Sequence, residues 1–152
     1  MESVHSIYDR HGVRYALEFI NERIWSIYLW RDGVQAGYAY CVPEAPGLKV
    51  NDLFISETMP LPEARWAGVW RRITGRPSPT YSNRGRGLGS ALMDFIVSQA
   101  TARKFIRVEG DIFAKDFETN PDLPDWYCKR GFTLTWHPPG SQRVAGLVRH
   151  LG

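Results

Sequence analysis

Three glycines alternate with other residues directly before the clearest helical pattern in the chain, in the segment RGRGLGS from Arg84 to Ser90. At a helix N-terminus, four backbone N–H groups have no partner inside the helix, and the helix dipole is positive. Glycine lets an anion approach these groups, because it has no Cβ in the way. Arg84 and Arg86 add cationic donors. The segment therefore predicts a diphosphate site at the start of a helix.

The helix itself is indicated by the spacing of its apolar residues. They recur at helical intervals from Leu88 to Ile96, and Arg103-Lys104 suit the negative end of the helix dipole. Beyond it we expect a strand, a short helix stopped by a glycine, and two closing strands. These elements are Phe105–Phe113, Asp122–Lys129 with Gly131 as its stop, Phe132–Trp136 and Arg143–Leu151.

The first third of the chain reads as an antiparallel β-meander. Asp32-Gly33 is its best hairpin signal, because a type I′ turn needs a positive φ at both central residues. Both faces of the strand before this turn are apolar, as for a strand covered on two sides. One face of the strand after it is expected to carry Val34, Ala36, Tyr38, Tyr40 and Val42. The four expected strands are Val13–Ile20, Arg23–Arg31, Val34–Val42 and Leu48–Ser56.

The composition indicates one globular domain. Of the 152 residues, 43% are apolar and 23% are charged, which argues against a disordered chain. The two cysteines belong to no Cys/His cluster, so neither a zinc site nor a disulfide framework is expected. The segment before Arg14 lacks the apolar core of a signal peptide, and no stretch reaches the length of a membrane span. A cytoplasmic protein without a membrane partner is therefore expected.

Other glycine motifs fit the segment less well. A P-loop needs Gly-Lys-Ser/Thr, but Gly89 is followed by Ser90 and Ala91. A dinucleotide fingerprint needs a third glycine where Ser90 stands, and it needs an early βαβ unit in place of a meander. A glycine-rich turn that only caps a helix remains open on this segment alone.

A second motif lies downstream. The pattern Arg-x-x-Gly-x-Gly at Arg84, Gly87 and Gly89 resembles the acetyl-CoA motif of the GNAT superfamily of N-acetyltransferases. The segment NPDLPDWYCKRGF, from Asn120 to Phe132, is similar to that family's second signature. The resemblance implies an α/β (α+β) fold with a mixed, mostly antiparallel central sheet flanked by helices. It also implies a single acyltransferase domain over residues 1–152.

The resemblance implies acetyl-CoA (coenzyme A) as co-substrate and no metal. In the family this molecule enters a splay between two central strands, here Leu48–Ser56 and Phe105–Phe113. The backbone of Phe54 and Ile55 would pair with the pantetheine arm, and Asn120 would bind near it. The pyrophosphate would be held by the N–H groups of Arg84, Gly85, Arg86, Gly87, Leu88, Gly89 and Ser90.

The resemblance also implies the catalytic residues. Tyr127 occupies the family's general-acid position, next to the thioester sulfur and in contact with the cofactor. Asp52 and Glu57 flank the end of the fourth strand, where some members place a base that works through water. Glu109 and Asp111 on the following strand are rival bases.

The chain departs from the family on the acceptor side. The family usually has two helices after its first strand, but Asn21-Glu22 leaves no room for them. Residues 57–83 form an insertion, with a helix expected from Pro62 to about Thr74, and Trp66 and Trp70 on its apolar face. We expect this insertion to act as a lid over the acceptor pocket.

The expected reaction is transfer of an acetyl group to a primary amine of a small molecule or peptide. A non-catalytic acyl-CoA-binding module is the alternative. Nucleic-acid binding through the Arg-rich stretch from Arg65 to Arg86 is a weaker interpretation, because no nucleic-acid motif accompanies it, so no nucleic-acid partner is expected. A homodimer remains open.

Overall fold

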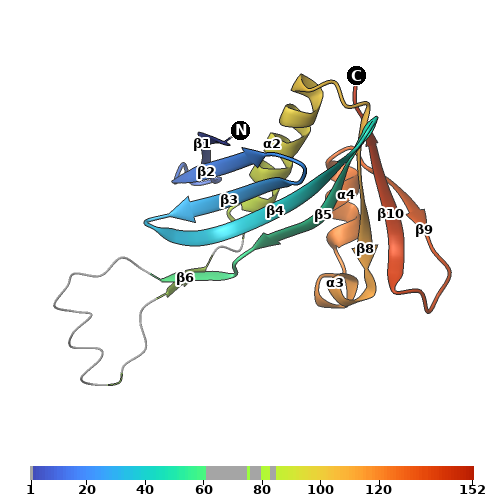
Figure 1. Ribbon diagram of the computed structural model, residues 1–152. Coiled ribbons are helices and arrows are strands. Elements are labelled where there is room, and N and C mark those ends of the chain that lie inside the picture. The colour runs from blue at the N-terminus through green and yellow to red at the C-terminus, as the bar shows by residue number, and fades with distance from the viewer. Residues whose placement is uncertain (1, 61–74, 76–79, 83–84) are drawn as a thin grey trace.

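The computed structural model describes residues 2–60, 75, 80–82 and 85–152. One sheet has the strand order β1-β2-β3-β4-β5-β8-β10-β9, and β6 and β7 form a second, two-stranded sheet (Figure 1). The strands of the large sheet are β1 (Glu2–Tyr8), β2 (Arg14–Asn21), β3 (Trp25–Arg31), β4 (Val34–Glu44), β5 (Gly47–Ile55), β8 (Arg107–Phe113), β9 (Thr133–Trp136) and β10 (Arg143–His150). The remaining elements are β6 (Thr58–Pro60), β7 (Thr80–Ser82), α2 (Leu88–Ala102), α3 (Ala114–Thr119) and α4 (Leu123–Lys129).

The sheet is mostly antiparallel, as expected. The β5–β8 pair alone is parallel among the pairs of the described strands. Asp32 and Gly33 have φ values of 51° and 75°, which confirms the turn with two positive φ angles between β3 and β4. The helix α4 ends before Gly131, whose φ of 86° confirms its role as a helix stop.

Outside residues 57–83, two elements were not expected. The strand β1 alternates exposed and half-buried residues at the edge of the sheet, so its apolar period is weak. The helix α3 spans six residues and buries none of them, so it has no apolar periodicity to detect.

The prediction that Ala36, Tyr38 and Tyr40 share one face of the strand after the turn is wrong. Leu29 pairs with Gly37 and Trp30 pairs with Gln35, so Ala36 is an extra residue in a β-bulge. The bulge shifts the alternation of buried and half-buried side chains along β4 by one residue. Ala36 is buried together with Ala39 and Cys41, whereas Tyr38 and Tyr40 lie on the opposite face and are half-buried.

The expectation that β3 is covered on both faces is also wrong for the described residues. Trp25, Ile27 and Leu29 are buried, but the residues between them are only half-buried. On that outer face Tyr28 packs against Tyr40, with ring centroids 6.1 Å apart. Aromatic rings therefore shield one another where a second layer was expected.

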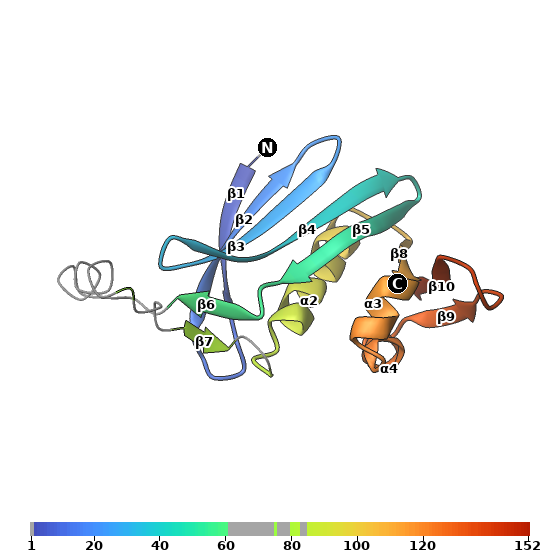
Figure 2. The same cartoon turned by 90° about the horizontal axis from the view of Figure 1, so that it is seen from below.

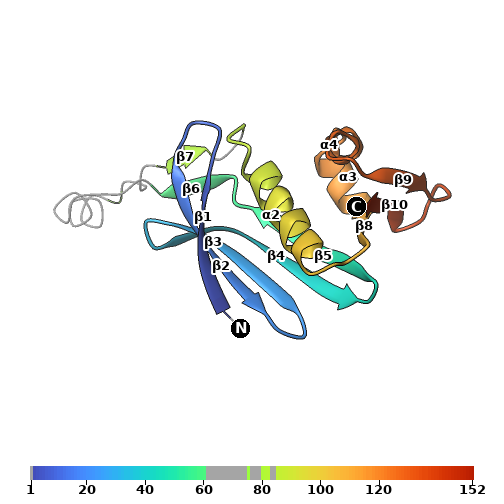
Figure 3. The same cartoon turned by 90° about the horizontal axis from the view of Figure 1, so that it is seen from above.

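The helix α2 covers the inner face of the sheet and contacts β1, β5 and β8 (Figures 2 and 3). Burial of each large apolar side chain contributes about 1.5–3 kcal/mol, so this face holds the helix firmly. The buried residues of α2 are Leu88, Leu92, Met93, Ile96, Val97 and Ala100. Among the described residues, no helix combines the length and the apolar character needed to span a membrane.

The strands β5 and β8 separate after a short contact. They pair only at Gly47, Leu48 and Lys49, which lie opposite residues 107–109. Beyond this point β5 continues beside β4, with a bulge at Asn51, and β8 continues beside β10 (Figure 1). The expected splay between these two strands is therefore present.

The strands β6 and β7 pair at the two ends of the insertion. The helix expected from Pro62 to Thr74, with Trp66 and Trp70, lies outside the described residues.

Candidate functional site

Two adjoining cavities lie where β5, α2 and α4 meet. The first, of about 530 Å³, lies at the N-terminus of α2, and we call it the cradle cavity. The second, of about 460 Å³, lies between the separated parts of β5 and β8, and we call it the splay cavity. Ile55, Gly89 and Trp126 line both cavities, so the two cavities adjoin.

The backbone of the cradle cavity is set by glycine. Gly85 and Gly87 have φ values of 70° and 75°, a backbone conformation that is unfavourable for residues with a Cβ. Gly87 is the N-cap of α2, and no side chain in the described part of the chain caps the helix there. The first turn of α2 carries no acidic residue. Its N–H groups and the positive end of the dipole therefore remain available to an anion.

The Arg86 side chain, which was expected to face the phosphates, lies against a carboxylate. Its guanidinium donates a hydrogen bond of 3.0 Å to Asp9, whose side chain is fully buried. The backbone N–H of Arg10 also donates to the Arg86 carbonyl, at 2.7 Å. The turn between β1 and β2 therefore holds the cradle loop in place. Arg84, the other expected cation, lies outside the described residues.

Asp9 is held in its ionised form. Burial alone would raise the pKa of its carboxyl group, but hydrogen bonds from the Val13 backbone, the Arg86 guanidinium and the His11 backbone outweigh burial. The net effect is a pKa below the usual value for Asp. The hydrogen bonds from Val13 and His11 measure 2.9 and 2.8 Å, so the negative charge is well satisfied.

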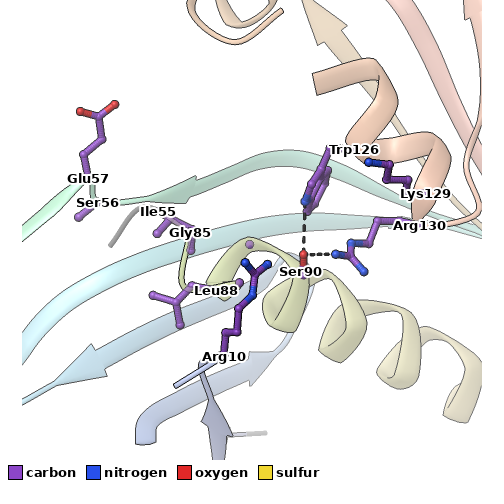
Figure 4. Close-up of a pocket in the computed structure, with 12 residues that line it drawn as sticks. Arg10, Ile55, Ser56, Glu57, Gly85, Leu88, Ser90, Trp126, Lys129 and Arg130 are labelled. Atoms are coloured by element: carbon purple, nitrogen blue, oxygen red, sulfur yellow. Dashed lines mark hydrogen bonds between the residues drawn. The ribbon is translucent and has the colours of Figure 1, made fainter. Parts of the chain in front are cut away.

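The cradle cavity is lined by three cations that were not predicted from the sequence as site residues: Arg10, Lys129 and Arg130 (Figure 4). Arg10 belongs to the turn between β1 and β2, and nothing local in the sequence links that turn to the glycine segment. Lys129 and Arg130 stand at the end of α4, inside the second motif. Two adjacent cations before Gly131 were a usable signal for an anion site.

The splay cavity is lined by several of the expected residues. Asp52, Phe54, Asn120 and Tyr127 all line it, although they come from β5, α4 and the segment before α4. Ile55 lies where the two cavities meet. The fold therefore brings together residues that are far apart in the sequence.

Tyr127 is half-buried in this cavity. Its ring packs edge-on against Trp126 and Phe132, with centroids 4.8 and 5.4 Å away. Burial, with a smaller effect from the Asp116 carboxylate, raises the pKa of Tyr127 to about 12. The phenol therefore keeps its proton at neutral pH and is available as a proton donor.

The candidate bases occupy different places. Asp52 lines the splay cavity with Tyr127 and accepts a 3.1 Å hydrogen bond from the Tyr38 hydroxyl. That contact raises the pKa of Tyr38. Glu57 lines the cradle cavity instead. Of the two rivals on β8, Asp111 lines the splay cavity and Glu109 lines neither.

The two alternative candidate bases on β8 are paired with cationic side chains. Asp111 lies 3.8 Å from both Lys49 and Arg143, and Glu109 accepts a 3.2 Å hydrogen bond from Arg107. Among the described residues, no group of three or more His, Cys, Asp or Glu residues is arranged to hold a metal ion.

No family model matches this chain, and no curated protein matches it by sequence. Solved structures do match. The structure of Ard1 from Thermoplasma volcanium aligns with a TM-score of 0.55 and 17% identity, covering 84% of this chain and 70% of that one. The ribosomal-protein-S18-alanine N-acetyltransferase from Escherichia coli aligns with a TM-score of 0.54 and 14% identity, covering 88% and 74%.

A third neighbour is the PaiA N-acetyltransferase from Thermoplasma acidophilum, which was solved in complex with coenzyme A. It aligns with a TM-score of 0.56 and 9% identity over 85% of this chain, which spans 62% of its length. At these identities the likeness concerns the fold. The mixed sheet, the splayed pair of strands and the solved neighbours agree: this chain has the fold of the GNAT superfamily of N-acetyltransferases.

Proposed function

We propose that the protein is an N-acetyltransferase that uses acetyl-CoA and acetylates a primary amine. The observation that carries the proposal is that the two cavities adjoin and share lining residues. One end offers the features that bind phosphate, and the other holds a tyrosine that keeps its proton. A molecule with phosphates at one end and a reactive thioester at the other fits this arrangement.

The chain offers a fitting set of contacts for acetyl-CoA. The N–H groups of residues 85–90 would hold the pyrophosphate, because Gly85 and Gly87 adopt positive φ angles and carry no Cβ that could cover the helix N-terminus. The open edge of β5 at Phe54 and Ile55 would pair with the amide groups of the pantetheine arm. Asn120 would bind the same arm from the other side of the splay cavity. When bound, acetyl-CoA supplies an acetyl group activated as a thioester.

Two side chains would move protons in the splay cavity. The acceptor amine arrives as ammonium, and Asp52 would take its proton, directly or through a water molecule. The freed amine nitrogen bonds to the acetyl carbon as the carbon–sulfur bond breaks. Tyr127 would give its proton to the departing sulfur, and it would recover, through water, the second proton that the nitrogen loses on becoming an amide. Glu57 is a weaker candidate for the base, because it lines the other cavity.

The acceptor is an amine of a small molecule or a peptide. Asp52, Asp111 and Asp116 line the splay cavity and Lys115 is its one cation among the lining residues, so an ammonium group meets a favourable field there. This balance supports an amine acceptor over an acidic one.

The test is a binding measurement followed by a turnover assay. We expect acetyl-CoA to bind in calorimetry and to release free thiol when the right amine from a panel is added. Binding without turnover on any amine would favour the alternative, a non-catalytic acyl-CoA-binding module. Absence of any binding of CoA would refute both functions.

A further inference from the structure

Among the described residues, no group accepts the hydroxyl hydrogen of Ser90. Its oxygen accepts a hydrogen bond from the Trp126 indole N–H at 3.3 Å and a second from the Arg130 guanidinium (Figure 4). A serine hydroxyl has two acceptor lone pairs and one donor hydrogen. Since Ser90 lines the cradle cavity, the group that completes its hydrogen bonding there must be an acceptor.

Arg130 points to the same conclusion. Its Nε is buried and has no hydrogen-bond partner among the described residues. The guanidinium stacks on Trp126, with its carbon 5.5 Å from the ring centroid, and the Arg130 carbonyl accepts a 2.7 Å hydrogen bond from Arg149. The residue is therefore held in position while part of its donor capacity stays unused, which is costly unless an anion is bound.

The cradle cavity has cations on two sides. Arg10, Lys129 and Arg130 line the cavity and Glu57 is its one acid among the lining residues. Arg10 lies beside Gly87, within 3.8–4.0 Å of where a Cβ at Gly87 would stand, so it flanks the helix N-terminus. The helix N-terminus and Arg10 lie together, and we place the pyrophosphate there. Lys129 and Arg130, on the α4 side, remain for another anion.

We propose that Ser90, Lys129 and Arg130 form a second phosphate subsite that binds the 3′-phosphate of coenzyme A. The subsite makes the protein select CoA over dephospho-CoA, which has the same pyrophosphate but lacks this group. A phosphate monoester carries close to two negative charges at neutral pH, and it accepts several hydrogen bonds at once. Both properties match two cations and one free hydroxyl hydrogen. The inference rests on the proposed function, because it assumes that the cradle cavity receives CoA.

The test compares CoA with dephospho-CoA by calorimetry on the purified full chain. The unmodified protein is expected to bind CoA at least about tenfold more tightly, the effect of one or two charge-assisted hydrogen bonds. Ser90→Ala and Lys129→Ala should each weaken CoA binding by about three- to tenfold and leave dephospho-CoA binding within about twofold. Neither substitution removes a buried apolar group, so both variants should fold.

The control is Arg23→Ala, which removes an exposed cation from the turn between β2 and β3, away from both cavities. It should change neither affinity. Equal binding of CoA and dephospho-CoA by the unmodified protein would overturn the subsite and leave the proposed function standing. Equal losses for both ligands in Ser90→Ala and Lys129→Ala would also overturn it. If neither ligand binds, the proposed function itself fails.

Discussion

The two cavities are built from different parts of the chain. The cradle cavity depends on main-chain geometry: positive φ angles at Gly85 and Gly87, an uncapped helix N-terminus, and a loop held by the buried Asp9. The splay cavity depends on individual side chains, and two of them, Asp52 and Phe54, are exposed. A backbone site binds a group common to many reactions, whereas side chains decide which reaction follows. We therefore expect changes in the cradle cavity to affect CoA affinity, and changes in the splay cavity to affect turnover.

Gly87→Asp should have the largest effect. The substitution places a carboxylate at the N-cap of α2, where it repels phosphate, and it strains a residue with a φ of 75°. We expect a loss of about 4 kcal/mol in CoA binding, or about 1000-fold in Kd, measured by calorimetry.

The matched control is Gly33→Asp, in the turn between β3 and β4. Gly33 has the same φ of 75°, and no atom of the described residues lies within 4 Å of where its Cβ would stand. The strain is therefore comparable, and the site lies away from the phosphates. Its CoA affinity should remain normal. A similar loss of affinity in both variants would mean that strain, not charge at the helix N-terminus, explains the result.

Asp9→Asn tests whether the loop anchor is part of the cradle. The change removes the negative partner of Arg86 inside the protein, and breaking a buried ion pair in this way costs about 3 kcal/mol. We expect a matching drop in the free energy of unfolding, measured with urea, together with weaker CoA binding. If a folded Asp9→Asn protein binds CoA with unchanged affinity, the contact between Asp9 and Arg86 does not contribute to the binding site.

The same variant has a pH signature. Because the pKa of Asp9 is lowered on folding, its stabilising effect is present above its unfolded pKa and is lost as the pH falls through the folded value. The stability difference between the unmodified protein and Asp9→Asn should therefore be constant near pH 7 and should shrink below about pH 4. A difference that grows on acidification would contradict this assignment.

The sequence allowed prediction where the signal is local. Gly85 and Gly87 are identifiable because few other residues tolerate their φ angles, and α2 because its apolar residues recur at helical spacing. Asp32-Gly33 is identifiable for the same reason as the cradle glycines. Each of these signals depends on a few neighbouring residues and requires no knowledge of the rest of the fold.

The features that could not be predicted depend on contacts between residues far apart in the sequence. Asp9 and Arg86 are separated by 77 positions, and no local pattern indicates that they meet. The Asp9 side chain accepts hydrogen bonds from the backbone of His11 and Val13, which marks a turn but not the loop that this turn supports. The bulge at Ala36 likewise arises from pairing with β3, so alternation alone placed the wrong residues on one face.

Tyr127→Phe should affect the splay cavity alone. The substitution keeps the ring contacts with Trp126 and Phe132 and removes only the proton that the leaving sulfur would take. We expect kcat to fall by about 100-fold, measured by thiol release, while the Kd for CoA stays within about twofold. Because the pKa of Tyr127 is about 12, activity should not fall between pH 7 and 9 through loss of this proton. Tyr8→Phe, at an exposed position on β1, should leave kcat unchanged.

Asp52→Asn should have the smallest effect of the series. Asp52 is exposed, so water can take over part of its role as base, and we expect a fall of about tenfold in kcat with normal CoA affinity. Glu57→Gln is the matched comparison, since Glu57 is also an exposed carboxylate near the end of β5 but lines the cradle cavity. Its kcat should stay within about twofold. If Glu57→Gln lowers kcat and Asp52→Asn does not, the base lies in the cradle cavity, and the assignment of binding to one cavity and chemistry to the other is wrong.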